Sequence, residues 1–145
     1  MARNRPEEHP RQSKLCAEHS PTRRAALGRT HLVVAQLAAE LAAFAALAAA
    51  IIATSGRSMA LEFGTVLAVA VCVLCVWHRR RDLLFFGVVA VAGTVGELVF
   101  VHFGIWRYAH PVFLGIPAWF PIAFGTAGVV GARIVATIDS ARGSS

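Results

Sequence analysis

Four apolar runs, separated by polar stretches, constrain the fold of this chain more than any other feature. They cover residues 32–53, 59–77, 83–104 and 121–138. A helix of about 20 residues crosses the hydrocarbon core of a bilayer. Hydrophobic residues make up 57% of the 145-residue chain and charged residues only 15%, which is too apolar for a small soluble domain. We therefore predict an all-α polytopic membrane bundle of about four transmembrane helices.

Basic residues predict the orientation of this bundle. Residues 1–30 read as a disordered cytoplasmic tail, 31–139 as the transmembrane domain and 140–145 as a second cytoplasmic tail. With both termini inside, twelve of the 14 Lys and Arg residues lie on the cytoplasmic side, and only Arg57 and Arg107 lie outside. This asymmetry is typical of the positive-inside rule. The net charge of +6 is thereby explained without nucleic-acid binding, which we do not expect.

Acidic side chains inside the predicted helices are the strongest candidates for function. We expect Glu40 near mid-membrane and Glu97 about 11 Å from the outer end of its helix. A charged side chain at such depth costs about 2–3 kcal/mol on insertion scales, so each carboxyl group should face the bundle interior. Each is either a functional group or a structural hydrogen-bond partner for a neighbouring helix. Gln36 shares a helix face with Glu40, four residues away.

Aromatic residues and prolines crowd the exit of the third helix. Pro121 is a favoured first-turn residue, so we expect the last helix to begin there. Residues 110–120 should then form an extended connector at the outer interface. Its aromatic side chains and those just before it resemble an aromatic belt. Together with the polar residues above they are our candidates for a lipid-binding pocket: Gln36, Glu40, Glu97, Trp106, Tyr108 and Trp119.

Other sites are not expected from the sequence. Cys72 and Cys75 are spaced as in redox and metal motifs but lie in an apolar run, where a thiol is a small packing group. No motif for a catalytic nucleophile, a cofactor or a metal is present, so we predict no catalytic residue, cofactor or metal. Small residues at 125, 128 and 131 instead predict close helix packing.

The stretch from Gly104 to Gly128 resembles the last two helices of the insulin-induced-gene (Insig) family. The matching residues are Gly104, Tyr108, Pro111, Phe113, Leu114, Ile116, Trp119, Pro121, Phe124 and Gly128. The basic loop after Trp77 falls where that family has a cytosolic basic loop. The resemblance implies a non-enzymatic helical bundle that binds a lipid or sterol-like molecule, or regulates a membrane protein partner. Four short helices enclose little volume, so we also expect a homo-oligomer.

A second resemblance involves the same region. Glu97, followed by F-G-I-W-R-Y and G-I-P-A-W-F-P, is similar to elements of the membrane carotenoid hydratases. That likeness implies an enzyme acting on an isoprenoid or carotenoid lipid, with Glu97 as its acid or base. A proton-coupled carrier that uses Glu40 and Glu97 is a third hypothesis. Lipid binding is the leading one, and catalysis is the alternative.

Overall fold

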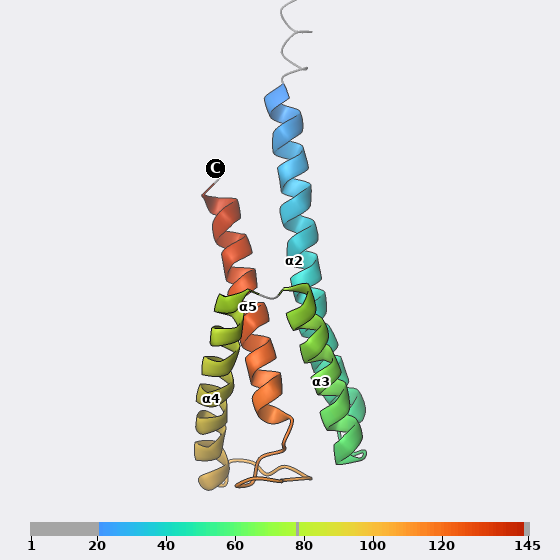
Figure 1. Ribbon diagram of the computed structural model, residues 1–145, viewed down its shortest axis with the longest axis vertical. Helices are drawn as coiled ribbons and strands as arrows, with labels where there is room; N and C mark the ends of the chain where they lie inside the picture. Colours follow the sequence, from blue (N-terminus) through green and yellow to red (C-terminus); the bar gives the residue numbers. More distant parts are fainter. Residues whose placement is uncertain (1–20, 78, 144–145) are drawn as a thin grey trace, which may run out of the picture. The chain divides into compact units, whose positions relative to one another are not determined.

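The computed structural model describes residues 21–77 and 79–143, which form four α-helices (Figure 1). They are α2 (Pro21–Thr54), α3 (Met59–Val76), α4 (Arg80–His102) and α5 (Phe120–Arg142). All four are long and apolar enough to cross a membrane. The predicted all-α fold with four candidate spans is confirmed, and it indicates a multi-pass membrane protein. The predicted tail at 1–20 with its cysteine, His78 and residues 144–145 lie outside the described residues.

The chain divides into two units, Met1–Ala35 and Gln36–Ser145, and α2 begins in the first and ends in the second. Helix α2 includes residues 21–30, which the sequence pattern assigned to the tail. Alanine, leucine and arginine dominate that stretch and are strong helix formers, so the helix does not stop where hydrophobicity does. Everything below concerns the second unit.

Local sequence signals define the helix starts. Ser58 caps α3, and its hydroxyl oxygen accepts a hydrogen bond from the backbone amide of Leu61 at 3.3 Å. The carboxylate of Asp82, in the first turn of α4, accepts one from the amide of Arg79 at 3.2 Å. Helix α5 begins at Phe120 with Pro121 in its first turn, one residue from the predicted start.

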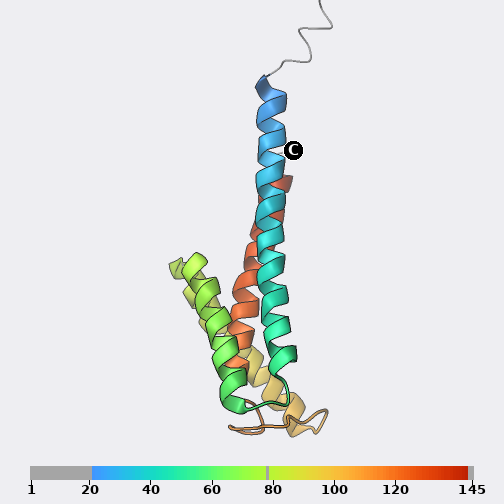
Figure 2. The same cartoon turned by 90° about the vertical axis from the view of Figure 1, so that its right-hand side faces the viewer.

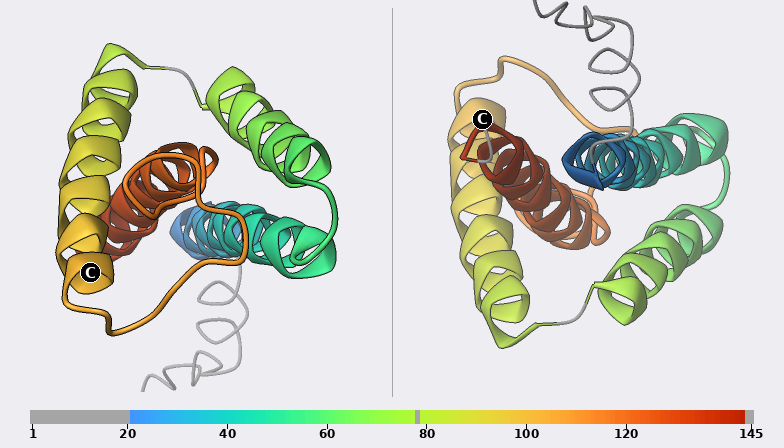
Figure 3. Two further views of the ribbon diagram at one scale, coloured as in Figure 1. Left: turned by 90° about the horizontal axis from the view of Figure 1, so that it is seen from below. Right: turned by 90° about the horizontal axis from the view of Figure 1, so that it is seen from above.

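Helix α5 is the centre of the second unit. It packs closely against α4 and, over a smaller area, against α3, and no other pair of described helices comes into comparable contact. Seen end-on, α4, α3 and the later part of α2 form an arc around α5 (Figure 3). Helices α2 and α3 instead diverge from the turn that joins them (Figure 2).

Glycines permit the close approach of α4 and α5. A Cβ atom added to Gly128 would lie 2.6 Å from a methyl group of Val89, and one added to Gly93 would lie 2.0 Å from the Phe124 ring. Within lipid, such contact between small residues is a principal source of helix–helix affinity. A Cβ atom added to Gly131, the last of the three small residues predicted to pack closely, would meet nothing within 4 Å.

The connector between α4 and α5 is folded rather than extended, contrary to prediction. It makes a tight turn in which the amide of Ile116 donates to the carbonyl of Phe113 at 2.9 Å. Leu114 and Gly115 both have positive φ at this turn, which is the requirement for the two central residues of a type I′ turn. The fold buries Ile116 and Trp119, which are only 3% and 7% exposed. Trp119 is therefore a core residue and not part of an interfacial belt.

Candidate functional site

Glu97 is buried near the end of α4, where it accepts hydrogen bonds from the connector. Its Oε1 atom accepts one from the indole nitrogen of Trp106 and one from the hydroxyl of Tyr108. Glu97 as a whole residue is 6% exposed. The Trp106 ring also packs on Phe100 of α4, with ring centroids 5.1 Å apart. These contacts tie the returning chain to the helix that it has just left, and we call them the Glu97 clasp.

The Tyr108 hydroxyl is held in its neutral, donating form. Burial raises the pKa of Tyr108 well above its ordinary value, and the hydrogen bond and negative charge of Glu97 raise it further. The ring meets Trp119 and Phe120 edge-on, at centroid distances of 6.4 and 5.9 Å. The Glu97 clasp is thus continuous with the aromatic start of α5.

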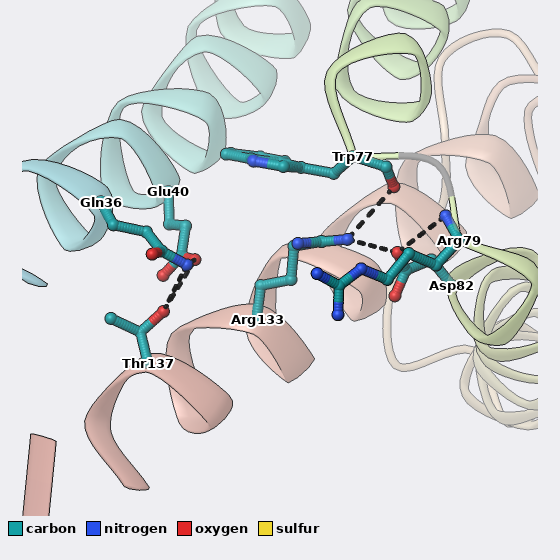
Figure 4. A network of polar contacts seen from close by, with 7 residues as sticks. All are labelled: Gln36, Glu40, Trp77, Arg79, Asp82, Arg133 and Thr137. Atoms are coloured by element: carbon teal, nitrogen blue, oxygen red, sulfur yellow. Dashed lines mark hydrogen bonds and ion pairs between the residues drawn. The ribbon is translucent and has the colours of Figure 1, made fainter. Parts of the chain in front are cut away.

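Glu40 forms a second polar cluster, between α2 and α5 (Figure 4). Its Oε1 atom accepts hydrogen bonds from the Thr137 hydroxyl at 2.9 Å and from the Gln36 amide at 3.2 Å. The same amide donates to the Thr137 hydroxyl at 3.1 Å. Glu40 is completely buried, and its Oε2 atom has no partner among the described residues.

Arg133 forms a third polar cluster one turn before Thr137 on α5. Its guanidinium pairs with Asp82 of α4, and its Nη2 atom lies 3.4 Å from the carbonyl oxygen of Trp77 at the end of α3. The guanidinium carbon lies 5.6 Å from the centroid of the Trp77 ring, in a cation–π arrangement. Trp77, Asp82 and Arg133 define what we call the arginine end of the bundle.

These contacts locate Glu40 relative to the ends of the neighbouring helices. Thr137 is about 6 Å further along α5 than Arg133, which is level with the end of α3 and the start of α4. Its partner Glu40 therefore lies at the arginine end, although it is near the middle of its own candidate span, Gly28–Thr54. The depth of Glu40 in the membrane stays a prediction from the sequence.

The six predicted pocket residues form two separate groups. Gln36 and Glu40 lie together at the arginine end, whereas Trp106, Tyr108 and Trp119 gather with Glu97 at the opposite end. The two ends are about 26 Å apart along α5, the length of helix between Phe120 and Thr137. The structure therefore offers no single pocket that contains all six.

An apolar groove lies between α2 and α3 and has a volume of about 480 Å³. Three alanines of α2 line one wall, Ala39, Ala43 and Ala46, and the other wall comes from α3. The lining is almost wholly apolar and includes Cys72, whose thiol is free. Trp77 closes the lining at the arginine end. The groove exists because α2 and α3 diverge, and its small alanines leave the space between them open.

Two smaller spaces border the aromatic residues. One of about 280 Å³ lies between α2 and α5 beside Trp119 and Phe44. The other, about 160 Å³, lies at the connector end and is lined by Glu62, Tyr108 and His110, among others. Glu62 is 7% exposed, and its position at the start of an apolar run does not by itself predict a role.

Sequence reasoning missed two partners that complete the polar clusters. Thr137 and Asp82 are ordinary residues at helix ends, and neither carries a motif. The available signal was spacing: Arg133 and Thr137 are four residues apart, so they share one polar stripe of α5. No three His, Cys, Asp or Glu side chains gather in residues 21–77 and 79–143 in a way that could hold a metal ion.

Comparison with known proteins yields no relative for this chain. No protein-family model, curated protein or solved structure matches it. The resemblance to the Insig family and the weaker one to carotenoid hydratases therefore stay predictions from the sequence.

Proposed function

We propose that this protein binds a lipid or sterol-like molecule in the groove between α2 and α3. The observation that carries the proposal is the groove itself, about 480 Å³ with an almost wholly apolar lining. This volume lies within the range of about 300–1,000 Å³ typical of small-molecule sites. Both walls belong to candidate membrane spans, so the molecules with ready access to it are those dissolved in the bilayer.

The polar clusters support binding rather than chemistry in this proposal. Glu40 and Glu97 each accept two hydrogen bonds from side chains of the protein. The bond from Thr137 joins α2 to α5, and those from Trp106 and Tyr108 join the connector to α4. Neither residue lines the α2–α3 groove. Their proposed role is to keep α2, α4 and the connector in place so that the groove persists.

The proposal includes a topology and partners. By the positive-inside rule the N- and C-termini face the cytoplasm, and the arginine end lies on the same side. Large apolar side chains cover the outer faces of the helices, including Leu84, Val91 and Ile52, which are 72%, 65% and 76% exposed. Such faces suit surrounding lipid, a membrane protein partner or a second copy of the chain. An Insig-like regulator would use them to contact its partner.

Lipid retention by purified protein tests the proposal. We expect mass spectrometry to detect lipid extracted from the detergent-purified wild type. The Ala43→Phe variant should lose this lipid, because the phenylalanine ring would fill the groove. Ala45→Phe is the matched control, because Ala45 is exposed and points about a third of a turn away from the groove. Recovery of no lipid from the wild type, or equal lipid from both phenylalanine variants, would overturn the proposal.

The Glu97→Gln variant separates binding from the enzymatic alternative. A glutamine oxygen can still accept hydrogen bonds from Trp106 and Tyr108, so lipid retention should persist. An enzyme that uses Glu97 as an acid or base would instead accumulate unconverted lipid in this variant. A changed lipid profile in Glu97→Gln with a normal profile in Ala43→Phe would favour catalysis.

A further inference from the structure

The α2–α3 groove has an almost wholly apolar lining, and a strongly basic segment of the chain follows the lining residue at its arginine end. Trp77 is its last lining residue, and Arg79, Arg80 and Arg81 follow within four positions. All three arginines are exposed. An apolar site and a cluster of positive charge are therefore adjacent along the chain.

No acidic side chain among the described residues pairs with the arginines that follow Trp77. Asp82 is the neighbouring acidic residue, and its carboxylate is already paired with Arg133. Figure 4 shows Arg79 beside this pair. Among the described residues, no ion pair involves Arg79, Arg80 or Arg81.

Trp77 joins the apolar and the charged regions. Trp77 lines the groove, and the guanidinium carbon of Arg133 lies 5.6 Å from the centroid of its ring. Tryptophan is enriched at the level of lipid headgroups, where one part of the ring is apolar and the other is close to water. The last residue of the apolar lining is thus of the type expected at the junction between acyl chains and headgroup.

We propose that the molecule in the groove is an anionic phospholipid, with an acyl chain between α2 and α3 and its phosphate against Arg79 and the two arginines after it. This inference rests on the proposed function, because it requires an occupied groove, and it adds the chemical class of the ligand. Guanidinium groups bind phosphate oxygens through paired N–H donors, so arginine suits this contact better than lysine. A sterol-like alcohol would leave the three arginines without a counter-charge.

Native mass spectrometry with two lipids of identical acyl chains tests the inference. Phosphatidylglycerol is the anionic probe and phosphatidylcholine the zwitterionic one. We expect the wild type to bind phosphatidylglycerol on the order of tenfold more tightly than phosphatidylcholine. Each basic residue near an anionic headgroup is worth roughly a fivefold change at most, so the three arginines together suffice for this preference. Replacing all three arginines, Arg79→Gln, Arg80→Gln and Arg81→Gln, should reduce the preference to twofold or less while leaving weak binding of both lipids.

Control variants locate the effect. Arg57→Gln removes a basic residue from the opposite end and should keep the full preference. If the triple variant is unstable, the double variant Arg80→Gln with Arg81→Gln replaces it. The double variant leaves Arg79 in place and should give an intermediate preference for phosphatidylglycerol. Ala43→Phe should weaken binding of both lipids equally. Inorganic phosphate should not compete, because it lacks an acyl chain.

The outcomes are separable. Equal affinity of the wild type for the two lipids, or an undiminished preference in the triple variant, overturns the anionic-lipid inference and leaves groove binding intact. Binding of neither lipid by the wild type overturns both. Displacement of the lipid by inorganic phosphate would show a headgroup site independent of the groove and would also overturn the inference.

Discussion

The hydroxyl of Tyr108 donates a hydrogen bond to the Oε1 atom of Glu97 and so joins two different parts of the fold. Tyr108 lies on the connector, whereas Glu97 lies inside a candidate membrane span. The bond converts an expensive intramembrane carboxyl group into an anchor for the turn that precedes α5. Glu97 was our strongest candidate for chemistry, and the structure gives it a structural partner.

Replacing Glu97 should separate shape from hydrogen bonding. Glu97→Leu leaves the Trp106 and Tyr108 donors without an acceptor, and we expect the free energy of unfolding to fall by about 1–3 kcal/mol. Glu97→Gln keeps an acceptor and should lose less than about 1 kcal/mol. Unfolding in mixed micelles measures both. Equal losses in the two variants would show that the Glu97 clasp contributes nothing.

Tyr108 gives a spectroscopic readout of the same contact, because it is the single tyrosine of the chain. The folded state raises its pKa through burial and the Glu97 charge. The associated stability is therefore present below the unfolded value near 10 and lost as the pH rises through the folded value. We expect tyrosinate absorbance to appear later in the folded protein than in the unfolded chain. Glu97→Gln should move the folded titration downward, and an unchanged curve would contradict the assignment.

Thr137→Val tests the link between α2 and α5. The variant keeps the side-chain shape but removes the donor to Glu40, and we expect a loss of about 0.5–2 kcal/mol, the range for hydrogen bonds between membrane helices. Thr94→Val is the control, since the Thr94 hydroxyl donates only to the Ala90 carbonyl of its own helix. A double-mutant cycle with Glu40→Leu, which removes the acceptor, should show coupling for Thr137 and none for Thr94.

Asp82→Asn should be far more damaging than Asp139→Asn. Asp82 pairs with Arg133, and both side chains are only about 15% exposed, so the variant leaves a nearly buried guanidinium without its counter-charge. We expect a cost of about 2 kcal/mol or more. Asp139 is exposed near the end of α5 and should tolerate the change. Thermal unfolding in detergent compares the two, and similar midpoints would mean that the ion pair is dispensable.

Glycine substitutions should map the contact between α4 and α5. Gly128→Ala places a methyl group against Val89, whereas Gly131→Ala, one turn along the same helix, meets open space. We expect the first to destabilise the bundle by about 1–3 kcal/mol and the second to be neutral or slightly stabilising. Equal effects of the two alanines would contradict the packing described for this face.

The sequence predicted the helices well because hydrophobicity and length suffice to recognise a membrane span. The start of the second apolar run at Met59 and the residue Pro121 placed two helix starts to within one residue. The start of α2 was misjudged because hydrophobicity marks where a helix enters lipid and not where it begins. The burial of Trp119 could not be read from the sequence, since a tryptophan near an interface has the same neighbours whether it points into lipid or into the core.

The polar clusters were only half predictable. Glu40 and Glu97 were identified by the cost of placing a carboxyl group in lipid, which requires some partner but does not name it. Thr137 and Tyr108 became partners through helix packing and connector folding, which depend on distances between segments. The groove between α2 and α3 likewise forms because these two helices do not pack closely against each other. No residue pattern in the sequence predicts that.

The central position of α5 has a consequence for the order in which the protein can be assembled. Synthesis reaches this helix after α2, α3 and α4, yet it is the one that α4 and α3 pack against and to which Glu40 of α2 is hydrogen-bonded. During synthesis the three earlier helices would enter the membrane with few contacts among themselves. They would come together when this 23-residue helix follows them. A chain that ends before Phe120 would thus lose more than one helix of four. It would also lose the contacts that hold the other three helices together.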